Sequence, residues 1–594
     1  MKCNRFSAAL AAALVLSAGI LLAQPSSAAK SLSSQASSSE HNWWQNAVFY
    51  EIYPRSFQDS NGDGIGDLNG ITSRLDYLKS LGVDAIWLTP VYPSPQVDFG
   101  YDISDYEAID PQYGTLADFD HLVAEANKRH IRVLMDMVMN HSSDKHKWFI
   151  QSRSSRNNPY RDWYVWHDGK GQTATSKGQP PNNWQSAFGH SAWKWDPKTR
   201  QYYYHKFYTE QPDLNWNNPK VHQAFKDIIN FWLNRGVAGF RFDAITTLFE
   251  DPSLADEGVL KDKDGKPRLN GLGEPMLDNS KTDNLPGVHD VMAEMRADAD
   301  TFDSNKFPGT RVFIGETYLP NIAQLAKQYG TPQKPEFHLP MDTLILLINK
   351  MDAPVFRSRI EDVETKIGNN TPLIVFDNHD NPRLDMRYGD GLHNTAIERA
   401  IATILFANRG AALFYYGDEI GMKTTPPARK QDVKDPVGIT GWPVYKGRDG
   451  ERTPMQWSDA PNAGFSKPGV NTWLPVPPTY TTVNVSAEEN DPNSMLSWYK
   501  DLIRLKKSVP ALADGDESML DTSSNSVLSW LRKAPGQPSV VVAINFTADP
   551  QTVDLSAAGA AAKTLLKSPG NAQPASLNHV ELEPFGVYMG EVEP

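Results

Sequence analysis

Short runs of β-branched and aromatic residues recur eight times along most of the chain, and each run ends in polar or charged residues. Segments with apolar residues three and four positions apart, such as 71–82, 116–130 and 222–236, separate them and predict helices. This alternation predicts a parallel sheet closed as a (β/α)8 barrel of the TIM type. The eight runs are residues 47–57, 83–92, 131–141, 237–244, 311–317, 336–342, 372–380 and 412–419.

Two long polar segments interrupt the barrel pattern. After the third run, residues 142–215 are rich in Trp, Tyr, Asn and Pro and are too long for an ordinary loop, so we expect an inserted subdomain there. A second insertion, residues 250–286, follows the fourth run. The barrel would then comprise residues 43–141 and 216–514. From residue 515 to 594 the pattern alternates with period two, which predicts a C-terminal all-β domain, a β-sandwich.

The N-terminus has the composition of an export signal. Lys2 and Arg5 precede an apolar run at 8–23 and then small residues through Ala29. We expect a signal peptide over 1–29, removed on export to the periplasm or the extracellular space, and a flexible Ser-rich linker over 30–42. A membrane anchor is the alternative, but the run is shorter than the ~20 residues that span a bilayer. The only cysteine is Cys3, so the exported chain would contain no disulfide.

The excess of acidic over basic residues makes some classes of binding partner unfavourable. A net charge of −13 disfavours binding to nucleic acid and to anionic membrane surfaces, both of which usually require an excess of Lys and Arg. We expect a monomer that acts on a small molecule.

Three carboxylates end predicted barrel strands: Asp243, Glu316 and Asp380. The reacting groups of such barrels lie at these strand ends, so the three should converge on one mouth. Each acid alone would more often be a helix cap or an ion-pair partner. Three carboxylates buried together are energetically unfavourable, so their presence indicates a catalytic function. Glycoside cleavage uses a nucleophilic carboxylate, a carboxylic acid that protonates the leaving oxygen, and negative charge near the cationic sugar.

Four motifs then identify a resemblance. DMVMNH (136–141), GFRFDA (239–244), IGET (314–317) and FDNHD (376–380) resemble, in order and spacing, the signature regions of the α-amylase superfamily of glycoside hydrolases, family thirteen. GYDISDY, YYYHKFYTEQPDLNW and RTPMQW are typical of its oligo-1,6-glucosidase and α-glucosidase branch. The resemblance implies that Asp243 is the nucleophile, Glu316 the general acid/base and Asp380 the transition-state stabiliser, with Asp243 and Glu316 ~5 Å apart, as in retaining enzymes.

The same resemblance implies the residues that bind substrate. Arg241 would keep Asp243 ionised, His141 and His379 would donate hydrogen bonds to sugar hydroxyls, and Tyr101 would stack on the sugar ring. Asp98 would pair with Arg452 and bind the non-reducing end, so the site would be a pocket that releases one glucose at a time. Phe188, Phe207 and Gln211 would line the acceptor side.

Ala244, directly after the nucleophile, bears on which glycosidic linkage the enzyme cleaves. Members of the branch that cleave α-1,6 bonds tend to carry Val there, whereas those that prefer α-1,4 bonds tend to carry Ala or Thr. We therefore expect an exo-acting α-glucosidase on maltose-like substrates, with transglucosylation as a side reaction. Oligo-1,6-glucosidase, sucrose or disaccharide isomerase and glucosyltransferase remain alternatives, although no RLDRD-type stretch typical of the isomerases is present; a non-catalytic sugar-binding protein is a remote one.

The loop DSNGDGIGDL (59–68) resembles the start of an EF-hand, but Gly70 stands where a closing Glu should be, and a strand rather than a helix precedes it. In this branch of the superfamily the loop often holds Ca²⁺ or Mg²⁺. The matching ligands are the side chains of Asp59, Asn61, Asp63 and Asp67 and the carbonyl of Ile65. We expect a structural cation there and no organic cofactor; an empty polar turn is the alternative.

Overall fold

The computed structural model describes residues 42–302, 309–520 and 523–592. Residues Asn42–Pro594 form one compact unit. The expected signal peptide, and all of the expected linker except Asn42, lie outside the described residues. Within the described part of the chain, no helix is long and apolar enough to cross a membrane.

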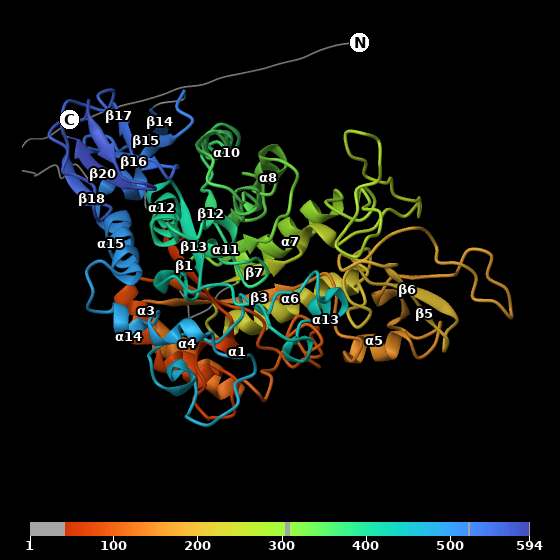
Figure 1. Cartoon of the computed structure of the whole chain (residues 1–594). Helices are drawn as coiled ribbons and strands as arrows, with labels where there is room; N and C mark the ends of the chain where they lie inside the picture. Colours follow the sequence, from red (N-terminus) through yellow and green to blue (C-terminus); the bar gives the residue numbers. More distant parts are fainter. Residues whose placement is uncertain (1–41, 303–308, 521–522, 593–594) are drawn as a thin grey trace, which may run out of the picture. The chain divides into compact units, whose positions relative to one another are not determined.

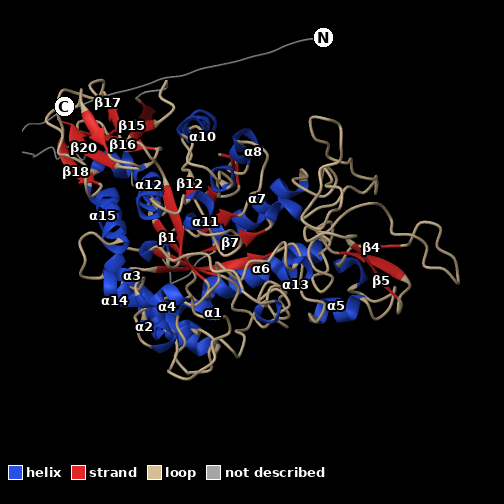
Figure 2. Cartoon of the chain, in the orientation of Figure 1, coloured by secondary structure: helices blue, strands red, loops and turns tan. Residues whose placement is uncertain are grey.

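The centre of the fold is an eight-stranded parallel sheet in the order β11-β8-β7-β3-β2-β1-β13-β12 (Figures 1 and 2). A parallel bridge between Met341 and Leu373 joins the two edge strands, so the sheet closes on itself as the predicted barrel. Seven of the predicted runs contain one of these strands, and the eighth run begins one residue after the start of its strand, β13. They are β1 Val48–Ile52, β2 Ala85–Leu88, β3 Arg132–Val138, β7 Gly239–Asp243, β8 Val312–Gly315, β11 Leu339–Pro340, β12 Leu373–Val375 and β13 Ala411–Tyr415.

Alternation along each strand divides its side chains between two environments. In β1, Val48, Tyr50 and Ile52 belong to the large apolar cluster that includes the surrounding helices, whereas Phe49 belongs to a separate cluster inside the barrel. In β7, Phe240 and Phe242 pack outward with the first cluster. Because successive side chains of a strand point to opposite faces, Arg241 and Asp243 point inward. Burial on both faces explains why the strands read as nearly continuous apolar runs.

Helices follow the strands and cover the barrel, as Figure 2 shows. Thr115 and Asp118 form a capping box that starts α4, and Asn218 caps α6, whose first residue is Pro219. Gly82 ends α3 at a φ of 96°, which an L-residue adopts only with strain. The main helices are α3 Leu75–Leu81, α4 Leu116–Lys128, α6 Pro219–Asn234, α7 Gly287–Thr301, α8 Ile322–Lys327, α10 Ala353–Lys366, α12 Asn394–Ala407 and α15 Met495–Ser508.

The inserted subdomain lies between β3 and α6, as expected. It contains α5 (Lys147–Ser152) and a three-stranded antiparallel sheet, β4 Trp166–His167, β5 Trp193–Asp196 and β6 Gln201–Tyr204. The 250–286 insertion has no helix or strand beyond isolated bridges, and it lies against this subdomain in Figure 1. The contact is specific: the Asn183 side chain donates to the Glu257 carbonyl at 2.9 Å, and the Trp184 indole donates to the Ala255 carbonyl at 2.9 Å.

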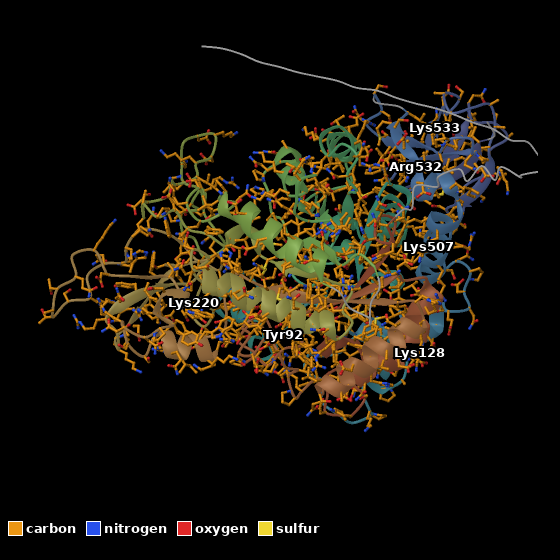
Figure 3. All side chains as sticks on the ribbon, turned by 180° about the vertical axis from the view of Figure 1, so that it is seen from behind. Tyr92, Lys128, Lys220, Lys507, Arg532 and Lys533 are labelled. Atoms are coloured by element: carbon orange, nitrogen blue, oxygen red, sulfur yellow. The ribbon has the colours of Figure 1, made fainter. Side chains whose placement is uncertain are left out.

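The C-terminal domain is all-β. Its main sheet has the order β14-β15-β16-β20-β18, and β17 pairs with β19. Arg532, fully buried on β15, donates to the Ala407 carbonyl at the end of α12 and to the Leu512 and Gly515 carbonyls, so one side chain joins the domain to the barrel (Figure 3). The strands are β14 Asp516–Met519, β15 Val527–Lys533, β16 Ser539–Asn545, β17 Gln551–Val553, β18 Lys563–Lys567, β19 Val580–Leu582 and β20 Val587–Val592.

Replacing this arginine should loosen the junction. We expect Arg532→Met to lower the free energy of unfolding by about 3 kcal/mol, because three buried carbonyls lose their donor. Chemical denaturation followed by circular dichroism measures the change. Arg504→Met is the matched control: its side chain on α15 is 59% exposed and pairs with exposed Asp501, so we expect a loss of no more than about 1 kcal/mol. Equal losses in the two variants would contradict the junction role.

Candidate active site

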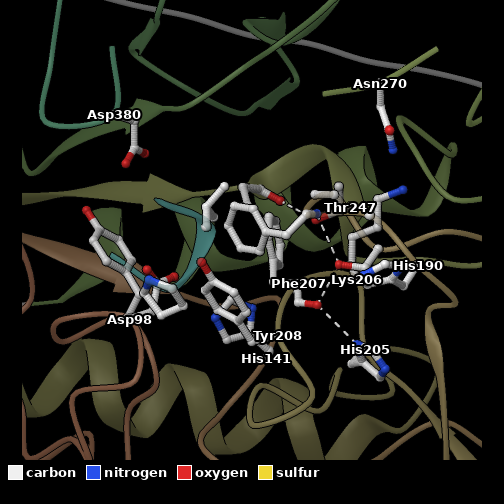
Figure 4. A pocket seen from close by; sticks show the side chains of 18 of the residues that line it. Asp98, His141, His190, His205, Lys206, Phe207, Tyr208, Thr247, Asn270 and Asp380 are labelled. Atoms are coloured by element: carbon white, nitrogen blue, oxygen red, sulfur yellow. Dashed lines mark hydrogen bonds between the residues drawn. The ribbon is translucent and has the colours of Figure 1, made fainter. Parts of the chain in front are cut away.

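The three predicted acids lie where barrel strands end, and they line one pocket. Asp243 is the last residue of β7, Glu316 directly follows β8, and Asp380 lies shortly after β12. The pocket has a volume of about 750 Å³, within the usual range for a small-molecule site, and Figure 4 shows Asp380 and Asp98 on one side of it.

One buried guanidinium holds the two reacting carboxylates. Arg241 is fully buried; its Nη1 donates to Asp243 Oδ1 at 2.6 Å, and its Nη2 lies 2.6 Å from Glu316 Oε1. Nη1 also donates to both oxygens of Asp136 at 3.1 Å. The backbone N–H of Ala244 donates to Glu316 Oε2 at 2.8 Å, so both oxygens of Glu316 are held. Asp243 and Glu316 therefore lie side by side on adjacent nitrogens of one side chain.

Burial sets the protonation of this pair. It raises the pKa of Asp243 to about 7 although Arg241 opposes the shift, and it raises the pKa of Glu316 to about 7 against the same guanidinium. Arg241 lowers the pKa of Asp243, the direction that the expected role of Arg241 requires, but desolvation raises that pKa by more than Arg241 lowers it. Since each charge disfavours the other, the pair loses its first proton more readily than its second. Near neutral pH one of the two carboxyls carries a proton.

Asp380 is in the opposite electrostatic situation. Its Oδ1 accepts from Arg452 Nη2 at 2.6 Å and from Arg448 Nη1 at 2.9 Å. Burial alone would raise the pKa of Asp380, but His379 and these two arginines outweigh it and hold that pKa far below its usual range. Asp380 is therefore a permanent negative charge beside the two titrating acids, as a group that stabilises a cationic transition state must be.

The predicted pairing of Asp98 with Arg452 is wrong. Asp98 Oδ1 accepts from Arg448 Nη2 at 2.8 Å, whereas Arg452 is fully buried and bonds the His379 carbonyl and Asp380. Arg448, four residues earlier, reaches the pocket wall. A further ion pair fixes its guanidinium: Nε donates at 2.9 Å to Asp435, which precedes α13 (Pro436–Gly441). Arg448 thus ties together Asp98, Asp380 and the chain segment that starts at Asp435.

The predicted substrate-binding residues fall into two groups. Six line the pocket beside the catalytic acids: Asp98, Tyr101, His141, Phe188, Phe207 and Ala244. Gln211, Arg241, His379 and Arg452 do not line it but support residues that do. Gln211 donates to Asp98 at 3.2 Å and contacts His141, and His379 stacks on Tyr101 with ring centroids 5.3 Å apart.

Several lining residues were not predicted. Four of them, Asn270, Leu272, Asn279 and Asp283, belong to the 250–286 insertion. The presence of this insertion was the sequence signal that could have indicated them. Others precede the RTPMQW motif in the chain. They are Pro436, Val437 and Thr440 of α13, and Tyr445 and Arg448 after that helix. Lys206 and Tyr208 flank the predicted Phe207, and Tyr318 lies two residues after Glu316.

The loop 59–67 is held by its own carboxylates. Asp59 accepts from the backbone N–H groups of Gly62 and Gly64, and Asp67 accepts from Ser60 and from Gly70, where it caps α2 (Leu68–Ser73). In the described part of the chain, no group of three or more His, Cys, Asp or Glu side chains is arranged to hold a metal ion. A cation in this loop would therefore also need the oxygens of Asn61 and Ile65. The donor set is all oxygen, which is the chemistry that Ca²⁺ and Mg²⁺ require.

A (β/α)8 barrel with a carboxylate pair on one arginine and a third, permanently ionised acid in the same pocket defines a glycoside hydrolase. The chain belongs to the α-amylase family: the family model "Alpha amylase, catalytic domain" matches residues 51–515.

Relatives of known name agree with this family. A probable alpha-glucosidase of Rhizobium meliloti is 39% identical over 523 residues, which is 87% of this chain and 91% of that protein. An oligo-1,6-glucosidase of Parageobacillus thermoglucosidasius is 38% identical over 86% of this chain and 91% of that protein.

Solved structures extend the comparison to related activities. An alpha-glucosyl transfer enzyme, XgtA, has a TM-score of 0.83 and 37% identity, covering 93% of this chain and 100% of that chain. The trehalulose synthase MutB from Pseudomonas mesoacidophila MX-45 has a TM-score of 0.82 and 36% identity, covering 93% and 99%.

The titrating pair predicts a bell-shaped pH profile. Asp243 must be ionised to attack, so activity should fall as pH drops; Glu316 must be protonated to assist the leaving group, so activity should fall as pH rises. Both pKa values are raised to about 7, and we expect kcat/KM to be greatest near pH 7. Initial rates across a pH series measure it. An alkaline limb that is absent up to pH about 9 would contradict the assignment of Glu316 as the acid.

Proposed function

We propose that the protein is an exported, retaining, exo-acting α-glucosidase that releases glucose from the non-reducing end of short α-glucosides and prefers α-1,4 linkages. The observation that carries the proposal is the Arg448 guanidinium joining Asp98 to Asp380 at the pocket wall. Names of relatives support an α-glucosidase, and the composition of residues 1–29 supports export.

The chemistry follows from the side chains in the pocket. Glu316, protonated, donates its proton to the glycosidic oxygen while Asp243 attacks the anomeric carbon, so the glucosyl group passes to Asp243 and the rest of the substrate leaves as an alcohol. Water then replaces Asp243 at that carbon, and Glu316 accepts the water's proton. Arg241 contacts both carboxylates, so it holds nucleophile and acid in register through the two steps.

The wall made by Asp98 and Arg448 supports exo-action. Both side chains are buried in an ion pair at 2.8 Å, and Gln211 adds a hydrogen bond to Asp98. A longer glucan could pass this point only if the pair opened, which would leave buried charges without partners. A terminal glucose, whose hydroxyls can bond to the same charged groups, fits without that cost.

The backbone at Ala244 supports the α-1,4 preference. Ala244 has a left-handed φ of 44°, and its small side chain lines the pocket next to the nucleophile. A β-branched residue such as Val would be strained in this conformation, so the position is suited to a small residue. Cleavage of α-1,6 bonds is the alternative, because one relative is named oligo-1,6-glucosidase.

A second candidate is transfer or isomerisation, which the solved structures of a glucosyl transfer enzyme and a trehalulose synthase favour. The same glucosyl-enzyme intermediate would then be captured by a sugar hydroxyl instead of water. RLDMR (383–387) is the nearest string to the isomerase-type arginine stretch, but Arg383 bonds Asp418 and the Tyr416 carbonyl, and Arg387 bonds the Ile348 carbonyl. Neither arginine lines the pocket, which supports hydrolysis.

A panel of substrates tests the proposal. Purified protein with maltose should yield glucose faster than with isomaltose, and a maltooligosaccharide blocked at its non-reducing end should resist cleavage. Asp243→Ala is the control for contaminating activity, because loss of the nucleophile should lower turnover by orders of magnitude. Liquid chromatography identifies the products. Rapid cleavage of the blocked substrate would refute exo-action, and a new disaccharide from sucrose in place of free monosaccharides would favour the isomerase.

The proposal includes a structural Ca²⁺ or Mg²⁺ in the loop 59–67, supported by its all-oxygen donor set. Removing a bound cation with a chelator should lower the melting temperature, since a ligand at 100 times its Kd stabilises by about 2.7 kcal/mol. Differential scanning calorimetry measures the shift and its reversal by added Ca²⁺. Asp63→Ala should abolish the chelator effect, whereas Asp76→Ala, an exposed acid outside the loop, should retain it. A melting temperature unchanged by the chelator would contradict the cation.

A further inference from the structure

The end of the pocket formed by the 250–286 insertion has several polar side chains and contains none of the three catalytic acids. Figure 4 shows Lys206, His190 and Asn270 on the opposite side of the pocket from Asp98 and Asp380. Leu272, Asn279 and Asp283 complete this end, and Thr247 connects it to the nucleophile strand. Because Asp98 and Arg448 close the glucose end, this other end is where the part of the substrate that leaves would lie.

The wall is rigidly attached to the subdomain. His190 donates its backbone N–H to Glu274 Oε2 at 2.9 Å, and its Nδ1 lies 2.7 Å from Glu274 Oε1. Lys206, only 5% exposed, donates to Thr282 Oγ1 at 2.9 Å and to Asn279 Oδ1 at 3.2 Å. Side chains from two separate segments are thus fixed relative to each other before a ligand arrives, which lowers the cost of binding.

Two side chains of this wall have unused hydrogen-bonding capacity. Asp283 Oδ1 is buried and has no hydrogen-bond partner among the described residues. The Lys206 ammonium has three N–H donors, of which the described contacts use two. A carboxylate oxygen and an ammonium in one wall suit a hydroxyl group, which both donates and accepts. Aromatic residues nearby, Phe188 stacked on Tyr208 at 4.3 Å, offer a flat apolar surface for a sugar ring.

We propose that Asp283 and Lys206 bind hydroxyl groups of the leaving-group sugar, so that the 250–286 insertion selects substrates whose aglycone is a sugar over those with an apolar aglycone. An apolar group at this end would leave both side chains without new partners, which is unfavourable in a buried site. The inference rests on the proposed α-glucosidase function and identifies residues for the second half of its substrate.

The test compares a sugar and a non-sugar leaving group. Maltose and p-nitrophenyl α-glucoside share the glucose that Asp98 and Arg448 would bind, but only maltose presents hydroxyls to Asp283 and Lys206. We expect Asp283→Ala and Lys206→Met each to lower the ratio of kcat/KM for maltose to that for p-nitrophenyl α-glucoside by about tenfold. The ratio does not depend on the fraction of folded enzyme. Asp278→Ala, on the same insertion but outside the pocket wall, should leave it unchanged.

The outcomes separate the two proposals. An unchanged ratio in both variants would overturn the role of Asp283 and Lys206, even if total activity falls. If Asp283→Ala does not accumulate, Asp283→Asn keeps the side chain's shape and gives the same comparison, with a smaller decrease expected because one acceptor remains. Wild-type enzyme that fails to cleave maltose would instead count against the proposed function, and the ratio would then be measured with whichever disaccharide it cleaves.

Discussion

The buried guanidinium of Arg241 is the interaction on which the site depends. Three carboxylates, Asp136, Asp243 and Glu316, surround one positive charge that has no access to solvent. Removing such a charge would leave acids buried and unpaired, which costs far more than the ion pairs contribute in net stability. The position of Arg241 is set by strand alternation in β7, two residues before Asp243. A local property of one strand thus fixes the geometry of the nucleophile and of an acid on the neighbouring strand.

A second arginine, Arg448, holds together the carboxylates of the pocket wall, as Arg241 holds together the two reacting carboxylates. Arg448 contacts Asp98, Asp380 and Asp435, which come from three distant parts of the chain. The two guanidiniums have different consequences for protonation. Burial outweighs Arg241 at Asp243 and Glu316, whereas His379, Arg448 and Arg452 together outweigh burial at Asp380. Acids in one pocket therefore take different protonation states near neutral pH, as a reaction that needs both an acid and a fixed anion requires.

The barrel could be predicted from the sequence because its strands are buried on both faces and end in conspicuous polar clusters. The acids at those ends follow from the topology, since parallel strands bring their carboxyl ends to one rim. The pairing of Asp98 could not be predicted, because Arg448 and Arg452 are four residues apart and only packing decides which one reaches the pocket. Which residues of 250–286 reach the pocket could not be predicted either, because an irregular polar segment has no periodicity that shows which side chains face inward. The raised pKa of Asp243 could not be predicted either, because the sequence shows the nearby charge of Arg241 but not the depth of burial that opposes it.

Ala244 has two roles that lie in different atoms of the same residue. Its side chain lines the pocket, while its backbone N–H, oriented by a left-handed φ, donates to Glu316. A substitution that changes the shape of the pocket here also perturbs the backbone conformation that orients the proton donor. The shape of the pocket and the orientation of Glu316 are consequently not free to vary independently at this residue, so an evolutionary change of pocket shape here would need a second, compensating change in the chain after β7 to preserve the position of Glu316.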